Sequence, residues 1–219
     1  MPQKRDAYAL AHKGLRNILF TCSRQIGATD FGDESARNEC LELIEWTFKF
    51  FDLHMQMEEE DYHPILESVE EGLSEQAHED HEGDEALHAA IRQGMQAITE
   101  VPADQLADAG YALYHAFNQW VAHYLLHIDH EDRVLEPRFF EVVDDAKMAA
   151  LRGKIMGKLS PEDMKRWMGF FLPALSNPEN AKLLSGIKAN APAPVYEGMA
   201  AGAKAVLGER WAAIEAAIG

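Results

Sequence analysis

The chain has 219 residues, of which 47% are hydrophobic and 26% charged, the composition of a globular protein with a sizeable core. Its formal net charge of −17 argues against nucleic acid as a partner, because phosphate binding needs basic patches. No apolar run approaches the roughly 18–20 residues that cross a bilayer, and we expect no membrane contact. A polar start without a signal peptide, with Cys22 and Cys40 at core-facing helical spacing, predicts a cytoplasmic protein with free thiols.

The first part of the chain predicts two amphipathic helices. From Asp6 to Gly27, apolar residues and His12 recur at steps of three and four, and Gly27 is a natural stop. After a turn-rich segment, a second helix carries His54 and Glu58 on its apolar stripe and is expected to end near Pro64.

Two further helices follow. The third begins in the acidic segment before His78 and runs to about Thr99, and Pro102 marks the turn after it. The polar members of its inner stripe are His81, Asp84 and His88. The fourth helix carries His127 and Glu131 and is expected to stop near Pro137. Nothing alternates with period two, so an all-α fold is expected, and four such helices predict an up-down-up-down bundle.

The remaining residues have a different character. Helix start signals stand at Ser160-Pro161 and Asn177-Pro178, and the segment contains no histidine. We therefore expect a four-helix bundle over residues 1–143 and a helical C-terminal extension over residues 144–219. The extension would serve packing or oligomerisation, and its amphipathic helices make a homodimer the expected assembly.

All ten histidines lie between positions 12 and 130. A single buried histidine is most often just hydrogen-bonded within a core. Four helices that each place a histidine on the inner stripe would bury several polar groups together, which is costly without partners. A shared metal ion removes this cost, because neutral imidazoles and carboxylates are its natural ligands.

One motif occurs twice. HMQMEEEDYHP begins at His54 and HIDHEDRVLEP begins at His127, and both read H-x3-E-x5-P. Residues i and i+4 share a helix face, so His54 with Glu58 and His127 with Glu131 each offer a nitrogen and an oxygen one turn apart. One such pair is a weak signal, but two with matching prolines are fairly specific for a metal site.

The ligand from the third helix is His78, His81 or His88. If the third and fourth helices reverse direction around residues 101–104, the neighbour of His127 is His78 or His81, whereas His88 is displaced by about 10 Å at 1.5 Å per residue. His81 shares the apolar stripe and is our choice.

The predicted metal ligands are His12, His54, Glu58, His81, His127 and Glu131. His88 would face His123 about two helical turns further into the bundle. The two could form a pair beside the metal ligands, an additional set of ligands or a polar patch. Asp84 is expected to accept a hydrogen bond from a ligand histidine. The remaining histidines are expected at the surface or the rim: His63, His115 and His130.

Residues 6–140 resemble the hemerythrin HHE family, most specifically in the two H-x3-E-x5-P segments and in AHKGLR around His12. The resemblance implies a four-helix bundle that holds a non-haem, oxo- or hydroxo-bridged pair of iron ions. The four histidines among the predicted ligands would be terminal ligands, and Glu58 and Glu131 would be bridging carboxylates. Manganese and zinc remain alternatives to iron.

The sequence departs from the oxygen-carrying members of that family. The third helix has no histidine pair at i, i+4, and the fourth ends its motif in glutamate at i+4. It is closer to the bacterial and regulatory members. We therefore predict a protein that binds or senses O2, another diatomic or an oxidant, and rank an enzyme lower. The alternatives are a di-iron oxidase or peroxidase, a nitric oxide or oxidative stress protein, and a helical adaptor with zinc or no metal.

Overall fold

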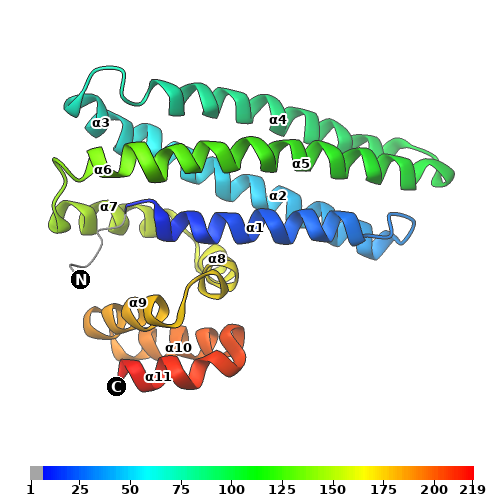
Figure 1. Ribbon diagram of the computed structural model, residues 1–219. Coiled ribbons are helices and arrows are strands. Elements are labelled where there is room, and N and C mark those ends of the chain that lie inside the picture. The colour runs from blue at the N-terminus through cyan, green and yellow to red at the C-terminus, as the bar shows by residue number, and fades with distance from the viewer. Residues whose placement is uncertain (1–6) are drawn as a thin grey trace. The chain divides into compact units, whose positions relative to one another are not determined.

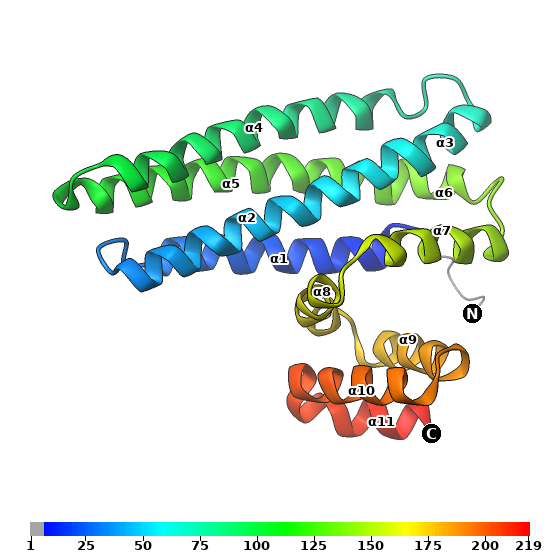
Figure 2. The same ribbon diagram turned by 180° about the vertical axis from the view of Figure 1, so that it is seen from behind.

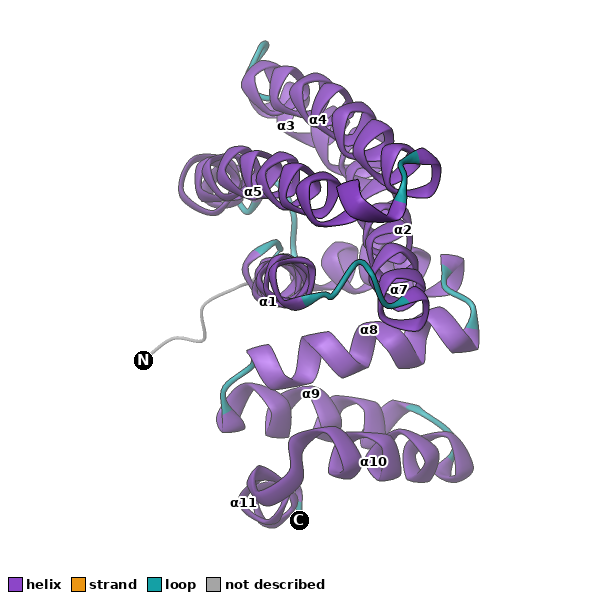
Figure 3. Cartoon of the chain, turned by 90° about the vertical axis from the view of Figure 1, so that its right-hand side faces the viewer, coloured by secondary structure: helices purple, strands orange, loops and turns teal. Residues whose placement is uncertain are grey.

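A computed structural model describes residues 7–219, except the side chains of residues 152, 155 and 156, and in this range every regular element is helical (Figure 3). The predicted all-α fold is confirmed. Asp6, the expected start of the first helix, lies outside the described residues. None of the described helices is long and apolar enough to span a membrane.

The chain forms two compact units. The first contains residues 18–151 and the described residues up to Tyr8, and the second contains residues 9–17 and 152–219. The boundary expected after residue 143 falls a short way before Leu151. A continuous N-terminal helix contributes to both units, and each unit is described by itself below.

Long helices dominate the first unit (Figures 1 and 2). Their bounds are α1 Ala9–Ala28, of which residues from Ile18 on belong here, α2 Glu34–Met57, α4 Glu75–Glu100 and α5 Leu106–His130. Asp33 caps α2 by accepting a hydrogen bond from the Ala36 N–H at 3.0 Å. Pro102 stands in the short connection after α4, and α5 returns antiparallel to α4 in both views. The chain therefore reverses direction between α4 and α5 at this short connection.

Aromatic side chains of α2 and α5 fill the core beside the repeated motif. Phe117, Trp120 and Tyr124 recur at steps of three and four along α5, and all three are fully buried. Phe51 of α2 packs edge-on against Trp120 and Tyr124, with ring centroids 4.8 and 4.6 Å away. Each fully buried side chain of this size contributes roughly 1.5–3 kcal/mol relative to an exposed one. The interior that surrounds the candidate site is therefore rigid and apolar.

Both helices that carry the repeated motif widen into a π-helix at its glutamate. The π-helices span Glu58–Tyr62 and Glu131–Leu135. In each, the carbonyl of the glutamate accepts a hydrogen bond from the N–H five residues later, at His63 and at Glu136. Such widened turns occur frequently at functional sites.

A proline occupies the second position after each π-helix. Proline lacks an N–H, and in a regular α-helix its ring collides with the carbonyl four residues back. The wider turn relieves this collision, and the chain stays helical through α3 (His63–Val69) and α6 (Glu136–Phe139). The expectation that the second helix ends near Pro64 is therefore wrong, whereas the fourth does end close to Pro137.

The second unit consists of short helices and the first turns of α1. The helices after α7 (Asp145–Lys158) are α8 Pro161–Ala174, α9 Asn177–Asn190, α10 Ala193–Leu207 and α11 Trp211–Ile218. Ser160 and Ser176 cap α8 and α9, which confirms both predicted start signals. The segment 9–17 packs within this unit: Asn17 donates a hydrogen bond to the Phe170 carbonyl at 2.7 Å.

Candidate metal centre

Four of the six predicted ligands meet in the interior of the first unit. Glu58, His81, His127 and Glu131 are all buried, and each offers one ligand atom within 4.8 Å of the other three. They come from three helical segments, because α2 and α5 lead into the π-helices that begin at the two glutamates, and α4 carries His81. His81 is the third-helix histidine of this group, and its role as a ligand stays a prediction.

His54 joins the same two glutamates on another side. One ligand atom of His54 lies within 4.8 Å of those of Glu58 and Glu131. Glu58 and Glu131 thus belong to two groups of possible ligands, one with His54 and one with His81 and His127. The two groups of possible cation ligands therefore overlap at these two buried carboxylates.

The two oxygens of Glu58 face different histidines. Oε1 lies 3.0 Å from Nε2 of His54, and Oε2 lies 3.5 Å from Nε2 of His81. A similar separation, 3.3 Å, joins Nε2 of His127 to Oε2 of Glu131. Two ligands at about 2.1 Å from one ion, at angles between octahedral and tetrahedral, are about 3.0–3.4 Å apart. The observed spacings therefore fit nitrogen–oxygen ligand pairs, and the donor set suits a first-row transition metal.

His12 lies on the part of α1 that belongs to the second unit, residues 9–17, where its side chain is buried. Its role as a ligand stays a prediction.

Without a cation, the carboxylate of Glu131 is poorly placed for ionisation. Burial, and then the charge of Glu58, raise the pKa of Glu131 well above its ordinary value. Burial also raises the pKa of Tyr8, and the charges of Glu131 and Glu58 raise it further. Burial lowers the pKa of His81, but its contacts with Glu58 and Glu59 outweigh that effect and raise the pKa to about 9. The cluster therefore holds protons where a cation would compensate the charge.

Two ligand histidines are oriented by carboxylates outside the cluster. Nδ1 of His81 lies 2.8 Å from Oε1 of Glu59, and Nδ1 of His127 lies 3.4 Å from Oδ2 of Asp80. A carboxylate that accepts the Nδ1 proton leaves Nε2 unprotonated and directed at the metal. The sequence pointed to Asp84 for this task, but the structure brings Glu59 and Asp80 to the two imidazoles.

Aromatic rings bound the cluster on the side of the core. The Tyr124 ring lies 5.3 Å from the His127 ring, and behind it stand Trp120 and Phe51. Phe50, the neighbour of Phe51 on α2, packs against Trp46 instead, with ring centroids 5.2 Å apart. These rings separate the ligand groups from bulk water.

The other candidate residues of the first unit have different surroundings. His88 is buried between the rings of Phe48 and Trp120, and burial, followed by the charge of Arg92, lowers its pKa to about 4. Its Nδ1 lies 3.6 Å from Asp52.

His123 and Asp84 form a pair of their own. Nε2 of His123 lies 3.0 Å from the Asp80 carbonyl and 3.7 Å from Oδ1 of Asp84. Burial is the main reason that the pKa of Asp84 rises to about 7. A β-carbon on Gly83 would stand 2.9 Å from the His123 ring, so glycine is needed for this close approach. A pairing of His123 with His88 stays a prediction.

Two histidines of the acidic segment, His63 and His78, belong to neither group of possible ligands that contains Glu58 and Glu131. His78 is exposed, with Nδ1 3.0 Å from Oε1 of Glu59. His63, expected at the surface or rim, is buried, and its ring stacks on His81 at a centroid distance of 5.4 Å and an angle of 12°. That expectation was wrong. A signal was present, because Glu59 and His63 form an i, i+4 pair.

The fold and the cluster define a helical-bundle protein with a buried, mixed histidine and carboxylate cation site. The model of the hemerythrin HHE cation-binding domain matches residues 4–149, and the chain belongs to this family. Comparison with curated proteins and with solved structures gives no match.

Proposed function

We propose that the chain holds two iron ions side by side, bridged by Glu58 and Glu131, and uses them to bind or sense O2 or a related diatomic or oxidant. The observation that carries the proposal is the orientation of the Glu58 carboxylate, whose oxygens lie 3.0 Å from His54 and 3.5 Å from His81. One carboxylate that presents an oxygen to a histidine on either side can span two ions.

In this proposal each ion has its own histidines. His81 and His127 serve one ion, and His54 serves the other together with His12, which lies within the family match. A mixture of imidazole and carboxylate ligands suits iron, and the same set would accept manganese or zinc. Six protein ligands for two ions leave coordination positions for a bridging hydroxide and a small external ligand.

Residues around the proposed metal pair orient its ligands and exclude water. When bound, the metal pair supplies positions at which a diatomic molecule binds and exchanges electrons. Glu59 and Asp80 hold the imidazoles of His81 and His127 with Nε2 inward. Tyr124 and the rings behind it exclude water, which favours a small apolar gas over a large substrate.

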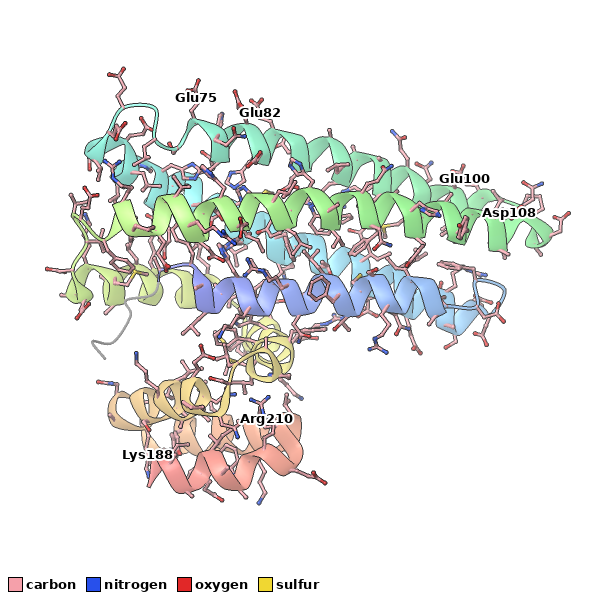
Figure 4. All side chains as sticks on the ribbon, viewed as in Figure 1. Glu75, Glu82, Glu100, Asp108, Lys188 and Arg210 are labelled. Carbon is pink, nitrogen blue, oxygen red and sulfur yellow. The ribbon has the colours of Figure 1, made fainter. Side chains whose placement is uncertain are left out.

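The first test is anaerobic loading of the metal-free protein with iron(II), followed by absorption spectra before and after oxygen is admitted. We expect saturation at two irons per chain and new bands in the near-ultraviolet and visible. Glu58→Ala should lose both, whereas Glu100→Ala, at an outward-pointing position of α4 (Figure 4), should lose neither. Unchanged iron stoichiometry in Glu58→Ala would refute the ligand assignment.

Two further outcomes separate the alternatives. Bands that disappear when oxygen is removed favour a binding or sensing protein, whereas many turnovers of oxygen or peroxide per iron pair favour an oxidase or peroxidase. If the protein binds no iron tightly, the remaining alternative is a helical adaptor that holds zinc or no metal. The cytoplasmic location is proposed on the free, buried thiols of Cys22 and Cys40.

A further inference from the structure

A second group of metal-ligating side chains lies next to the shared carboxylates, around Glu59. Its carboxylate lies 3.4 Å from Nδ1 of His63 and 3.0 Å from Nδ1 of His78, through different oxygens. Glu59, His63 and His81 also offer one ligand atom each within 4.8 Å of one another. We call Glu59, His63 and His78 the outer cluster, because Glu59 is part-exposed and His78 is exposed.

His63 is buried with little polar compensation from the protein. Its ring is 5% exposed, its polar contact is to Glu59 at 3.4 Å, and its Nε2 has no hydrogen-bond partner among the described residues. Burial of an imidazole with so little polar compensation costs free energy. A cation held between Nδ1 of His63 and Glu59 would replace this single long contact with a ligand bond to the buried ring.

We propose that the outer cluster is a third metal site, which takes one divalent first-row transition-metal ion through Glu59, His63 and His78. Two imidazoles and one carboxylate, with water in the remaining positions, are an established ligand set for zinc and iron(II). The two Glu59–histidine distances match ligand pairs of one ion. The group within 4.8 Å that contains Glu59 and His63 has His81 as its third member, so the exposed His78 must move toward His63 to complete the outer site. His81 keeps its Nδ1 on Glu59 and remains a ligand of the inner pair.

The surrounding charge favours a cation at this position. The sequence contains no lysine or arginine between Lys49 and Arg92, a stretch that includes the whole outer cluster. Glu82, exposed and pointing away from α4 (Figure 4), lies 3.8 Å from the other nitrogen of His78. A net negative surrounding of this kind concentrates divalent cations from solution.

The test is a count of zinc ions per chain by mass spectrometry, after dialysis of the metal-free full-length protein against buffered free zinc. We expect three ions for the wild-type chain and two for the His63→Ala/His78→Ala variant. His115→Ala, which removes an exposed histidine on α5, is the matched control and should retain three. Circular dichroism verifies that each variant is folded.

A further variant separates this site from the proposed iron pair. Glu58→Gln/Glu131→Gln should lose the two inner ions and retain the outer one. A wild-type chain that saturates at two ions, both lost in this variant, would overturn the outer site alone. A single ion that persists in this variant and vanishes in His63→Ala/His78→Ala would support the outer site and overturn the inner pair.

The exposed His78 allows a test that leaves the core intact. If the loss of His63 unfolds the chain, the single variant His78→Ala is used instead. Its affinity for the third zinc ion should be lower than that of the wild type by at least about tenfold. An unchanged affinity in His78→Ala, or three tight ions in the double variant, would refute the proposal.

Discussion

Glu131 should destabilise the metal-free protein at neutral pH, and Glu131→Gln should relieve this effect. The side chain is fully buried, and burial together with the charge of Glu58 raises its pKa well above the ordinary value of 4.5. Because the folded state holds this proton more tightly than the unfolded chain does, the contribution of Glu131 to stability is fully present below pH 4.5. It is lost as the pH rises toward the folded-state pKa.

The size of the effect follows from linkage. Between the unfolded and folded pKa values of one group, each pH unit changes the free energy of unfolding by about 1.4 kcal/mol. From pH 5 to pH 7, the wild-type protein should therefore lose stability relative to Glu131→Gln, which has the same shape and no charge, by at most about 2.5 kcal/mol. The two proteins should have similar stabilities at pH 5.

The assay is urea unfolding at pH 5, 6 and 7, followed by circular dichroism with a chelator present. Glu100→Gln, at an exposed position of α4, is the control and should follow the wild type. With manganese at a hundred times its dissociation constant the order should reverse, because the wild type gains about 2.7 kcal/mol for each inner ion that the variant does not bind, or about 5 kcal/mol for the proposed pair. An advantage of Glu131→Gln that does not grow with pH would refute the reasoning.

Two predictions concern the architecture. Gly110→Ala should lower the free energy of unfolding by about 1–3 kcal/mol, because its β-carbon would stand 2.1 Å from the Phe31 ring. The comparison in urea is Gly94→Ala, whose nearest contact is 3.3 Å and which should lose less. Ser176→Ala removes the capping box of α9 and should cost about 1 kcal/mol while the bound metal per chain is unchanged.

The sequence was sufficient to predict the helices and the central cluster. Steps of three and four fix which residues of α2 and α5 face inward, and the matching offsets of the two motifs bring His54, Glu58, His127 and Glu131 to one level. The division of the chain could not be predicted in the same way. Residues 9–17 continue one unbroken helix, and no change of composition marks their grouping with the second unit.

The position of His63 was missed for a physical reason. In a regular α-helix, five residues turn the chain by about 500°, so His63 would face about 140° away from Glu58. The π-helix absorbs one residue: the His63 N–H bonds to the Glu58 carbonyl, and His63 takes the place that i+4 would have had. It therefore turns inward and stacks on His81. Any stripe drawn with α-helical periodicity fails after the glutamate.

The proline of the repeated motif has a structural role that its ligands alone would not explain. A histidine and a glutamate four residues apart need only an α-helix, yet both copies place a proline six residues after the glutamate. Pro64 and Pro137 cannot donate to the helix, and both follow a widened turn that starts at the glutamate. The same turn that accommodates Pro64 brings His63 to Glu59. The motif thus specifies the inner carboxylates, and its first copy also contains Glu59 and His63 of the outer cluster.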